Sequence, residues 1–197
     1  MGLAQPEIRN AATVVLYRHM AGAPHVLMGT RGAKAAFMPS KVVFPGGAVE
    51  AQDYDQSVGL SKTTQQRLRL ESTVPPEALV TAGLRELWEE TGQIIDPAKT
   101  HEIAFIFRAL TQPGQPRRFD ARFLWVPATA LQSNPDVFEA ATNELSGLTW
   151  VPLGQADAWD VPFITRVVLA EARARLAGRQ GPVPFIDNLS PQVRYLG

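Results

Sequence analysis

The sequence contains no cysteine among its 197 residues. Disulfide bonds, thiolate catalysis and cysteine-based zinc sites are therefore excluded. The sequence also lacks a run of about 18 apolar residues, which a membrane-spanning helix would need, and a basic segment followed by an apolar one at the N-terminus. We therefore expect a soluble chain with no membrane partner and no targeting segment, and a reducing cytoplasm agrees with this composition.

Charge of one sign is also missing, because 19 basic residues balance 19 acidic ones. A chain without a basic field has no general attraction for nucleic acid, so any affinity for phosphate must come from locally placed arginines. The three histidines, His19, His25 and His101, share no spacing typical of a metal site. These features predict no nucleic-acid partner and give no support to catalysis by a serine–histidine pair.

What the sequence does contain is an acidic stretch at residues 83–92. At about 100° per residue, Glu86, Glu89 and Glu90 share one face of a helix, and apolar residues cover the opposite face. Like charges three and four positions apart repel one another, so a cation is the obvious compensator. Clustered carboxylate oxygens suit a hard ion such as Mg²⁺. The pattern predicts a helix with one core face and one metal face.

The limits of this helix can also be predicted. Proline is favoured at the first helical position, so Pro75 and Pro76 indicate where the helix starts. Gly92 stands where a left-handed cap would end it. About four turns fit between these limits, which is enough to carry both faces.

Upstream, residues 43–50 read Val-Phe-Pro-Gly-Gly-Ala-Val-Glu, a strand that enters a glycine turn. Gly47, followed by Arg85-Glu86-Leu87-x-Glu89-Glu90-x-Gly92, resembles the Nudix box. The pattern of that box is G-x5-E-x7-R-E-U-x-E-E-x-G-U, where U is an aliphatic residue. The resemblance covers roughly residues 11–126.

The match departs from the pattern in three ways. Asp53 stands where the first glutamate belongs, Gln93 replaces the last aliphatic residue, and 31 residues instead of seven separate Asp53 from Arg85. The additional residues form an insertion at about residues 54–74. A long insertion at this point of the box, with Phe37-Met38-Pro39 before it, resembles the branch of the family that contains the peroxisomal coenzyme A diphosphatases of animals. The insertion is expected to contain a short helix that Ser61 caps. It would serve as a lid or specificity element, or it would be a solvated excursion without a role in the site.

Apolar patterns predict the remaining elements and agree with the fold that the resemblance implies. That fold is an α/β class structure, a Nudix-type α/β/α sandwich around a mixed β-sheet, formed by a single domain over residues 1–197. The first two strands would form a hairpin through a turn at residues 22–24, and an extended tail would begin at about residue 179. The expected strands cover residues 10–18, 25–31, 102–110, 117–125 and 148–153, and a second helix covers 163–176.

Residues 117–125 alternate between two kinds of side chain. Phe119 and Phe123 point to one face, whereas Arg118, Asp120 and Arg122 point to the other. A sheet with a solvated outer face explains this pattern without a ligand. The paired arginines also suit bidentate contacts with phosphate, so we expect Arg118 and Arg122 to bind substrate.

Arg31 ends an expected strand and is a third candidate for binding a substrate phosphate, a solvated strand-end arginine being the alternative. Glu144 precedes the strand at 148–153, where many Nudix relatives hold a carboxylate that reaches the metal. Glu139 competes for that role, and each of the two glutamates could instead be a surface residue.

The resemblance implies a hydrolase that depends on Mg²⁺ or Mn²⁺. Glu89 and Glu90 would bind the metal together with the Gly46 carbonyl, and Glu86 would complete the cluster or help to deprotonate water. Arg85 would orient a carboxylate instead of touching substrate. The metal would lower the pKa of a bound water that attacks phosphorus.

The expected partner is a small-molecule nucleoside diphosphate linked to another group, with coenzyme A or acyl-coenzyme A as the first candidate. Many coenzyme A-cleaving relatives have a second arginine after the one at the position of Arg31, and a glycine four residues before the position of Phe44. This sequence lacks both, because Ala35 and Ala36 stand near the place of that arginine and Ser40 stands in the place of the glycine. ADP-ribose, a dinucleotide or a modified nucleoside triphosphate are alternatives. A non-catalytic nucleotide-sensing Nudix domain is an alternative of another class, and a homodimer is compatible with all of these.

Overall fold

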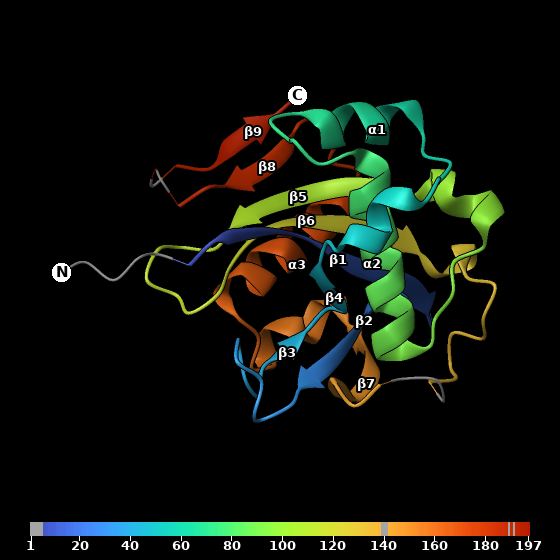
Figure 1. The fold of residues 1–197 in the computed structure, drawn as a ribbon. Helices are drawn as coiled ribbons and strands as arrows, with labels where there is room; N and C mark the ends of the chain where they lie inside the picture. The colour runs from blue at the N-terminus through green and yellow to red at the C-terminus, as the bar shows by residue number, and fades with distance from the viewer. Residues whose placement is uncertain (1–5, 139–141, 189, 191) are drawn as a thin grey trace.

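The computed structural model describes residues 6–138, 142–188, 190 and 192–197, whose strands form one mixed β-sheet (Figure 1). These strands are β1 (Ile8–Met20), β2 (Ala23–Arg31), β3 (Val42–Val43), β4 (Gly46–Ala48), β5 (Ala104–Leu110), β6 (Arg118–Pro127), β7 (Leu145–Pro152), β8 (Val183–Ile186) and β9 (Arg194–Leu196). Their order is β3-β2-β1-β6-β5-β8-β9, with β4 paired to β1 and β7 paired to β2. The pairs β1–β6 and β5–β8 are parallel and the others are antiparallel.

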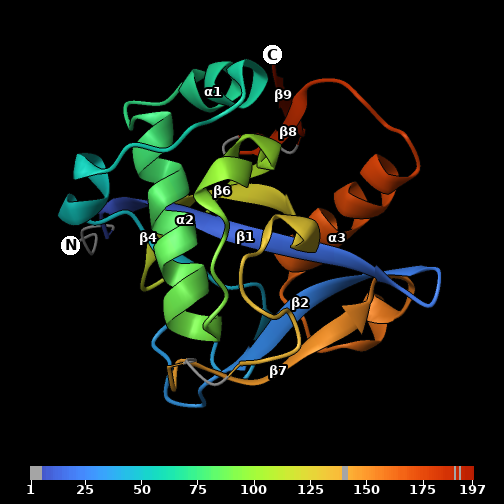
Figure 2. The same ribbon diagram turned by 90° about the vertical axis from the view of Figure 1, so that its right-hand side faces the viewer.

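Helices cover both faces of this sheet, as the resemblance implies. The helices are α1 (Lys62–Arg69), α2 (Pro76–Thr91) and α3 (Phe163–Leu176), with 3-10 helices η1 (Ala51–Asp55), η2 (Pro97–Glu102), η3 (Ala128–Ala130) and η4 (Leu153–Ala158). One hydrophobic cluster lies beneath α1 and α2 and a second beneath α3, on opposite sides of β1 (Figure 2). The predicted α/β architecture is confirmed. In the described part of the chain, no helix has the length and apolar character needed to cross a membrane.

Strand β1 contributes to both hydrophobic clusters. Val14 and Leu16 face α2, whereas Val15 faces α3, and all three are fully buried. Because successive residues of a strand point to opposite faces, the continuous apolar run of β1 predicts burial on both sides, which is confirmed. The hairpin to β2 turns at Ala21 and Gly22, one residue earlier than predicted, and both residues have the positive φ typical of a two-residue turn.

Helix α2 begins and ends where the sequence predicts. Pro76 is its first residue, and Gly92 follows it with a φ of 74° and donates its backbone N–H to the Trp88 carbonyl. Leu79 and Leu87 on its inner face are fully buried, and each contributes about 1.5–3 kcal/mol of hydrophobic stabilisation. This buried face fixes the rotation of the helix and therefore the direction in which its glutamates point.

The insertion at residues 54–74 forms α1 and packs into the core. The helix begins after Ser61, whose hydroxyl accepts a hydrogen bond from the backbone N–H of Thr64, so the predicted cap is confirmed. Leu68 and Val74 are buried in the cluster beneath α2. The alternative of a solvated excursion is therefore wrong, because the apolar residues of the insertion complete one edge of this cluster.

Shortening one buried side chain tests how much the insertion stabilises the fold. We expect Leu68→Ala to lower the free energy of unfolding by about 2–5 kcal/mol, because it leaves a cavity in a packed cluster. Urea denaturation measures this loss. Leu70→Ala is the matched control, since that side chain is 37% exposed, and we expect a change below about 1 kcal/mol. Equal losses in the two variants would contradict the assignment of the insertion to the core.

The charged face of β6 is buried, which contradicts the alternative of a solvated outer face. Arg122 is 2% exposed and donates hydrogen bonds of 2.7 Å to the Asn10 side chain and to the Asp120 carbonyl. Arg108 of β5 makes two hydrogen bonds to the Asp120 carboxylate, and its guanidinium also reaches the Glu71 carbonyl of the insertion. The backbone of the insertion thus covers this face, and burial lowers the pKa of Arg122 to about 10.

The C-terminal tail is part of the sheet. Strand β8 pairs in parallel with β5, and β9 pairs with β8. Arg67 of α1 donates a hydrogen bond to the Gly181 carbonyl, and Arg194 of β9 forms an ion pair with Glu71. These contacts join the tail to the insertion.

Candidate active site

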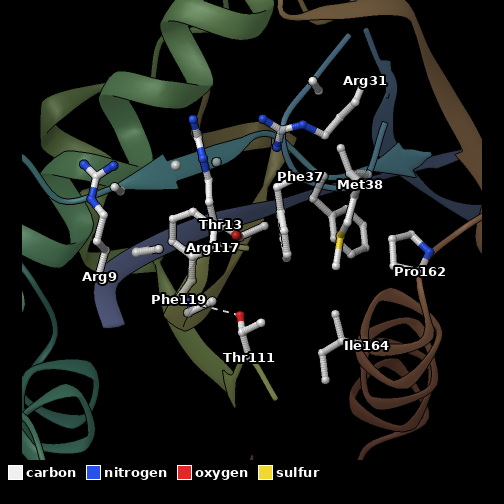
Figure 3. A pocket seen from close by; sticks show the side chains of 18 of the residues that line it. Arg9, Thr13, Arg31, Phe37, Met38, Thr111, Arg117, Phe119, Pro162 and Ile164 are labelled. Atoms are coloured by element: carbon white, nitrogen blue, oxygen red, sulfur yellow. Dashed lines mark hydrogen bonds between the residues drawn. The ribbon is translucent and has the colours of Figure 1, made fainter. Parts of the chain in front are cut away.

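A cavity of about 1270 Å³ opens between the glycine turn at β4, helix α2 and the face of the sheet that α3 covers. The loop at residues 32–41 and the start of α3 close its other side (Figure 3). Glu86, Glu89, Glu144 and Arg31 all line it. These four of the side chains predicted to act on a diphosphate therefore meet at one cavity, to which the insertion at 54–74 contributes no lining residue.

Two glycines let the turn approach its neighbours closely, Gly47 on the side of α2 and Gly46 on the side of β1. A Cβ added to Gly47 would lie 2.2 Å from Oε1 of Glu86, and one added to Gly46 would lie 2.6 Å from the Ala12 carbonyl oxygen. The backbone N–H of Gly46 donates a hydrogen bond of 2.8 Å to Oε2 of Glu90. The turn thus holds Glu86 on one side and Glu90, which is 1% exposed, on the other.

Arg85 connects the acidic groups to one another. Its Nη1 donates hydrogen bonds to Glu86 and Glu89, at 2.9 and 3.1 Å. Its Nε and Nη2 reach the two oxygens of Asp53, which is 1% exposed, and Nη2 also reaches the Ala48 carbonyl. Burial opposes the charge of Arg85, but hydrogen bonds to Asp53 and Glu86 raise its pKa above the ordinary value. Arg85 therefore orients carboxylates.

Burial and neighbouring carboxylates raise the pKa of Glu86 and of Glu90. Burial raises the pKa of Glu90 to about 8, and repulsion from Glu86 and Glu144 adds to the shift, while the Gly46 hydrogen bond and Arg31 oppose it. Burial also raises the pKa of Glu86, with Arg85 opposing and Glu89 and Glu144 adding repulsion. Repulsion between the carboxylates is the smaller contribution to both shifts, and a bound cation would relieve it.

The pKa of Glu90 leads to a prediction for the metal-free protein. The value of about 8 in the folded state exceeds the ordinary 4.5, so the folded state retains a proton that the unfolded chain releases between these values. We expect stability to fall as the pH rises from about 5 to about 8, and Glu90→Gln to flatten this dependence. Thermal unfolding in EDTA across this range measures both. The same pH dependence of Tm in the two proteins would contradict the assignment.

Arg31 is the last residue of β2, and Glu144 immediately precedes the neighbouring strand β7. Arg31 pairs in register with Leu145 across β2 and β7, and the Gly32 N–H donates to the Glu144 carbonyl. Among the described residues, the buried Nε of Arg31 has no hydrogen-bond partner. An unpaired buried guanidinium nitrogen at a cavity suits an anionic ligand. The competing candidate Glu139 lies outside the described residues.

Arg118 and Arg122 do not agree with their predicted role. The cavity is lined by Arg117, Phe119 and Phe123 of the same segment, so the arginines that alternate with them point to the opposite face. Arg118 and Arg122 are 8% and 2% exposed and lie within the buried polar layer beneath the insertion. The alternation was correctly predicted, but the face turned to the cavity is the aromatic one.

The donor set fits a divalent cation. Glu86, Glu89, Glu90 and the Gly46 carbonyl offer hard oxygen ligands, and their mutual repulsion is what such an ion relieves. Among the described residues, however, no group of three or more acidic or histidine side chains is arranged so that it could hold a metal ion by itself. Water and substrate phosphate oxygens would therefore supply the remaining ligands, an arrangement that Mg²⁺ favours.

Two residues that depart from the box pattern have clear structural roles. Asp53 holds Arg85 although 31 residues separate them, because η1 and α2 lie side by side. Gln93 is fully buried, and its side chain donates hydrogen bonds to the carbonyls of Asn134 and Val137. The capping box that Glu50 and Asp53 form could have indicated a structural role for Asp53. No local signal in the sequence indicates the role of Gln93.

Adding one methyl group to the glycine turn tests the position of Glu86. We expect Gly47→Ala to lower kcat/KM by about tenfold to a hundredfold with little loss of stability, because the new Cβ displaces a flexible carboxylate. Steady-state kinetics and thermal unfolding measure the two effects. Gly154→Ala is the control, since a Cβ there meets no atom within 4 Å. Unchanged kinetics in Gly47→Ala would show that the position of Glu86 does not matter.

Comparisons with known proteins agree with this geometry. Residues 7–171 match the model of the NUDIX domain. A NUDIX hydrolase from Alicyclobacillus acidocaldarius is 26% identical with a TM-score of 0.64, covering 83% of this chain and 90% of its own. The MutT protein from Methanosarcina mazei Go1 is 18% identical with a TM-score of 0.57, covering 90% of this chain and 100% of its own. The NUDIX domain of Shewanella oneidensis NrtR, solved with ADP ribose, is 16% identical with a TM-score of 0.57, covering 87% and 90%. No curated protein matches the chain.

Proposed function

The chain belongs to the Nudix family, and we propose that this Nudix pyrophosphohydrolase uses Mg²⁺ or Mn²⁺ to cleave the diphosphate of a nucleoside diphosphate linked to another group. The observation that carries the proposal is that Glu86, Glu89 and Arg31 line one cavity, while the buried Glu90 accepts a hydrogen bond from Gly46, which lines the same cavity. Carboxylates at this position favour a metal, and the arginine favours the phosphates that share it.

Each residue of the cluster has a role in the proposed reaction. Glu89, Glu90 and the Gly46 carbonyl hold the metal, and Arg85 keeps the carboxylates in place. When bound, the metal lowers the pKa of a water and neutralises the diphosphate. Glu86, whose own pKa is raised by burial, takes the proton of the attacking water or completes the ligand set. Glu144, beside it, is the second candidate for the proton acceptor.

We propose coenzyme A or its acyl derivatives as the substrate. The cavity is large enough for a ligand of this size, at about 1270 Å³. One part of its wall is apolar, with Phe37, Met38, Pro162 and Ile164 around it (Figure 3). Phe37 and Phe119 meet edge to face at 5.4 Å. An amphiphilic cavity suits a ligand that joins a charged nucleotide to a long uncharged arm.

A competition between diphosphates tests the proposal. Coenzyme A, acetyl-coenzyme A, ADP-ribose, NADH and a dinucleoside polyphosphate are each supplied with Mg²⁺ or Mn²⁺ at the same pH, and products are identified by chromatography. We expect the highest kcat/KM for a coenzyme A species, cut to phosphopantetheine and adenosine 3′,5′-bisphosphate. A higher kcat/KM for ADP-ribose or NADH would reject coenzyme A and keep diphosphate hydrolysis. Tight nucleotide binding without turnover of any compound would indicate the sensor alternative.

A further inference from the structure

Two arginines that the reaction does not use face the same cavity. Arg9 comes from β1, and Arg117 immediately precedes β6. In Figure 3 their guanidinium groups and that of Arg31 follow one border of the cavity, with Arg117 between the other two in this view. Arg31 is the arginine that acts on Glu90 electrostatically. Arg9 and Arg117 thus extend the positive border beyond the position expected for the diphosphate.

The sheet register sets the direction of both side chains. Arg9 lies opposite Phe119 in the parallel pairing of β1 with β6. Arg9, Ala11 and Thr13 alternate along β1 on the cavity side, as Arg117, Phe119 and Ala121 do along β6. Arg9 and Arg117 are therefore diagonal neighbours on one face, with Cα atoms about 8 Å apart by ordinary strand spacing. Two guanidinium groups at that spacing can reach one phosphate.

These two charges are not neutralised within the described chain. Neither Arg9 nor Arg117 makes a side-chain hydrogen bond or ion pair with another described residue. Glu50 also lines the cavity, and in the described part of the chain its carboxylate accepts hydrogen bonds from the Asp53 backbone and the Gln52 side chain but forms no ion pair with Arg9 or Arg117. Lys41, a possible competing cation, is paired with Asp160. The pair therefore offers two positive charges to a ligand.

From this arrangement we propose that Arg9 and Arg117 form a second anion site for a phosphomonoester on the nucleotide that the enzyme cleaves. The proposal rests on the proposed diphosphate hydrolysis and narrows its substrate class to nucleoside diphosphates that carry an additional phosphate on the ribose. A phosphomonoester carries up to two negative charges, which two guanidinium groups can match with bidentate hydrogen bonds. A substrate that lacks this group would leave both arginines without a partner.

Matched substrate pairs test the second site. The kcat/KM of coenzyme A is compared with that of dephospho-coenzyme A, and that of NADPH with that of NADH, in wild type, in Arg9→Ala/Arg117→Ala and in the control Arg69→Ala. Arg69 is an exposed arginine of α1 outside the cavity. In wild type, we expect at least one phosphorylated member to be preferred about tenfold or more. The double variant should lose most of that preference, with kcat/KM for the dephosphorylated member changed less than about twofold.

The outcomes separate this site from the hydrolase assignment. No preference in wild type, or an equal loss on both members of a pair, would overturn the second site and leave the hydrolase assignment intact. If the protein cleaves none of these diphosphates, the second site is tested by binding alone. The affinities of adenosine 3′,5′-bisphosphate and AMP for wild type and the double variant are then measured by isothermal titration calorimetry. We expect the bisphosphate to bind wild type about tenfold tighter than AMP and the double variant about equally. Equal binding of the two nucleotides by wild type would overturn the proposal.

Discussion

Glu90→Gln is expected to lower kcat by about a thousandfold, which corresponds to about 4 kcal/mol of lost transition-state stabilisation. The substitution keeps the size of the side chain and removes the charge that would hold the metal. Glu90 is 1% exposed and bound to the Gly46 N–H, so the amide can stay in place. Stability should hold or rise, because the substitution removes a carboxyl group whose ionisation is opposed by burial and by repulsion from Glu86.

Steady-state kinetics at saturating Mg²⁺ and thermal unfolding together measure these effects. Glu102→Gln is the matched control, since that exposed glutamate lies outside the cavity, and its kcat should equal that of wild type. A Glu90→Gln protein that turns over at the wild-type rate would remove Glu90 from the metal site. A protein that is inactive because it is unfolded would instead show a lost thermal transition.

Arg85→Ala should have the largest effect on stability, about 3–5 kcal/mol, together with a loss of activity. The reason is that Asp53, 1% exposed, would be left as a buried carboxylate without its guanidinium partner. Glu86 and Glu89 would also lose the group that orients them.

A double-mutant cycle separates the buried pair from ordinary loss of packing. Asp53→Ala/Arg85→Ala removes both charges, so its loss of unfolding free energy should be clearly smaller than the sum of the two single losses. Urea denaturation of the four proteins gives the coupling energy. Additive losses would mean that the Asp53–Arg85 pair contributes nothing specific, and that Arg85 acts through its other contacts.

The acidic helix could be predicted from sequence because all the information needed is local. The helical period fixes which residues share a face, and Pro76 and Gly92 fix the ends, with Gly92 in the left-handed conformation that its position indicates. The central strand β1 was predictable for the same reason, since an unbroken apolar run needs cover on both sides.

The face of β6 that meets the cavity could not be predicted, because alternation defines two faces without saying what covers each. The face with Arg118 and Arg122 is covered by backbone carbonyls of the insertion, such as those of Leu70 and Glu71, which accept hydrogen bonds from Arg108. These partners are 37 or 38 residues apart in the chain. Only the fold brings these residues together. The pairing of β5 with β8 of the C-terminal tail likewise depends on the fold and not on local sequence.

Asp53 shows the same limit from the opposite side. Its spacing from Arg85 breaks the box pattern, yet the insertion leaves the sheet after η1 and returns at α2, so the two side chains still meet. The number of residues between Asp53 and Arg85 gives the length of the connecting segment. Their ion pair depends only on the positions of the two ends of that segment in the fold. Arg9 was missed for a related reason, because its importance comes from its neighbour Arg117 on β6.

Binding of Mn²⁺ followed by electron paramagnetic resonance tests the central claim, which is that the carboxylates of α2 hold a divalent metal at this cavity. Wild type, Glu90→Gln and the control Glu102→Gln are titrated without substrate, and free Mn²⁺ is measured directly. We predict that Glu90→Gln binds Mn²⁺ at least about tenfold more weakly than wild type, while Glu102→Gln binds it equally well. Equal affinity of wild type and Glu90→Gln for Mn²⁺ would contradict the account.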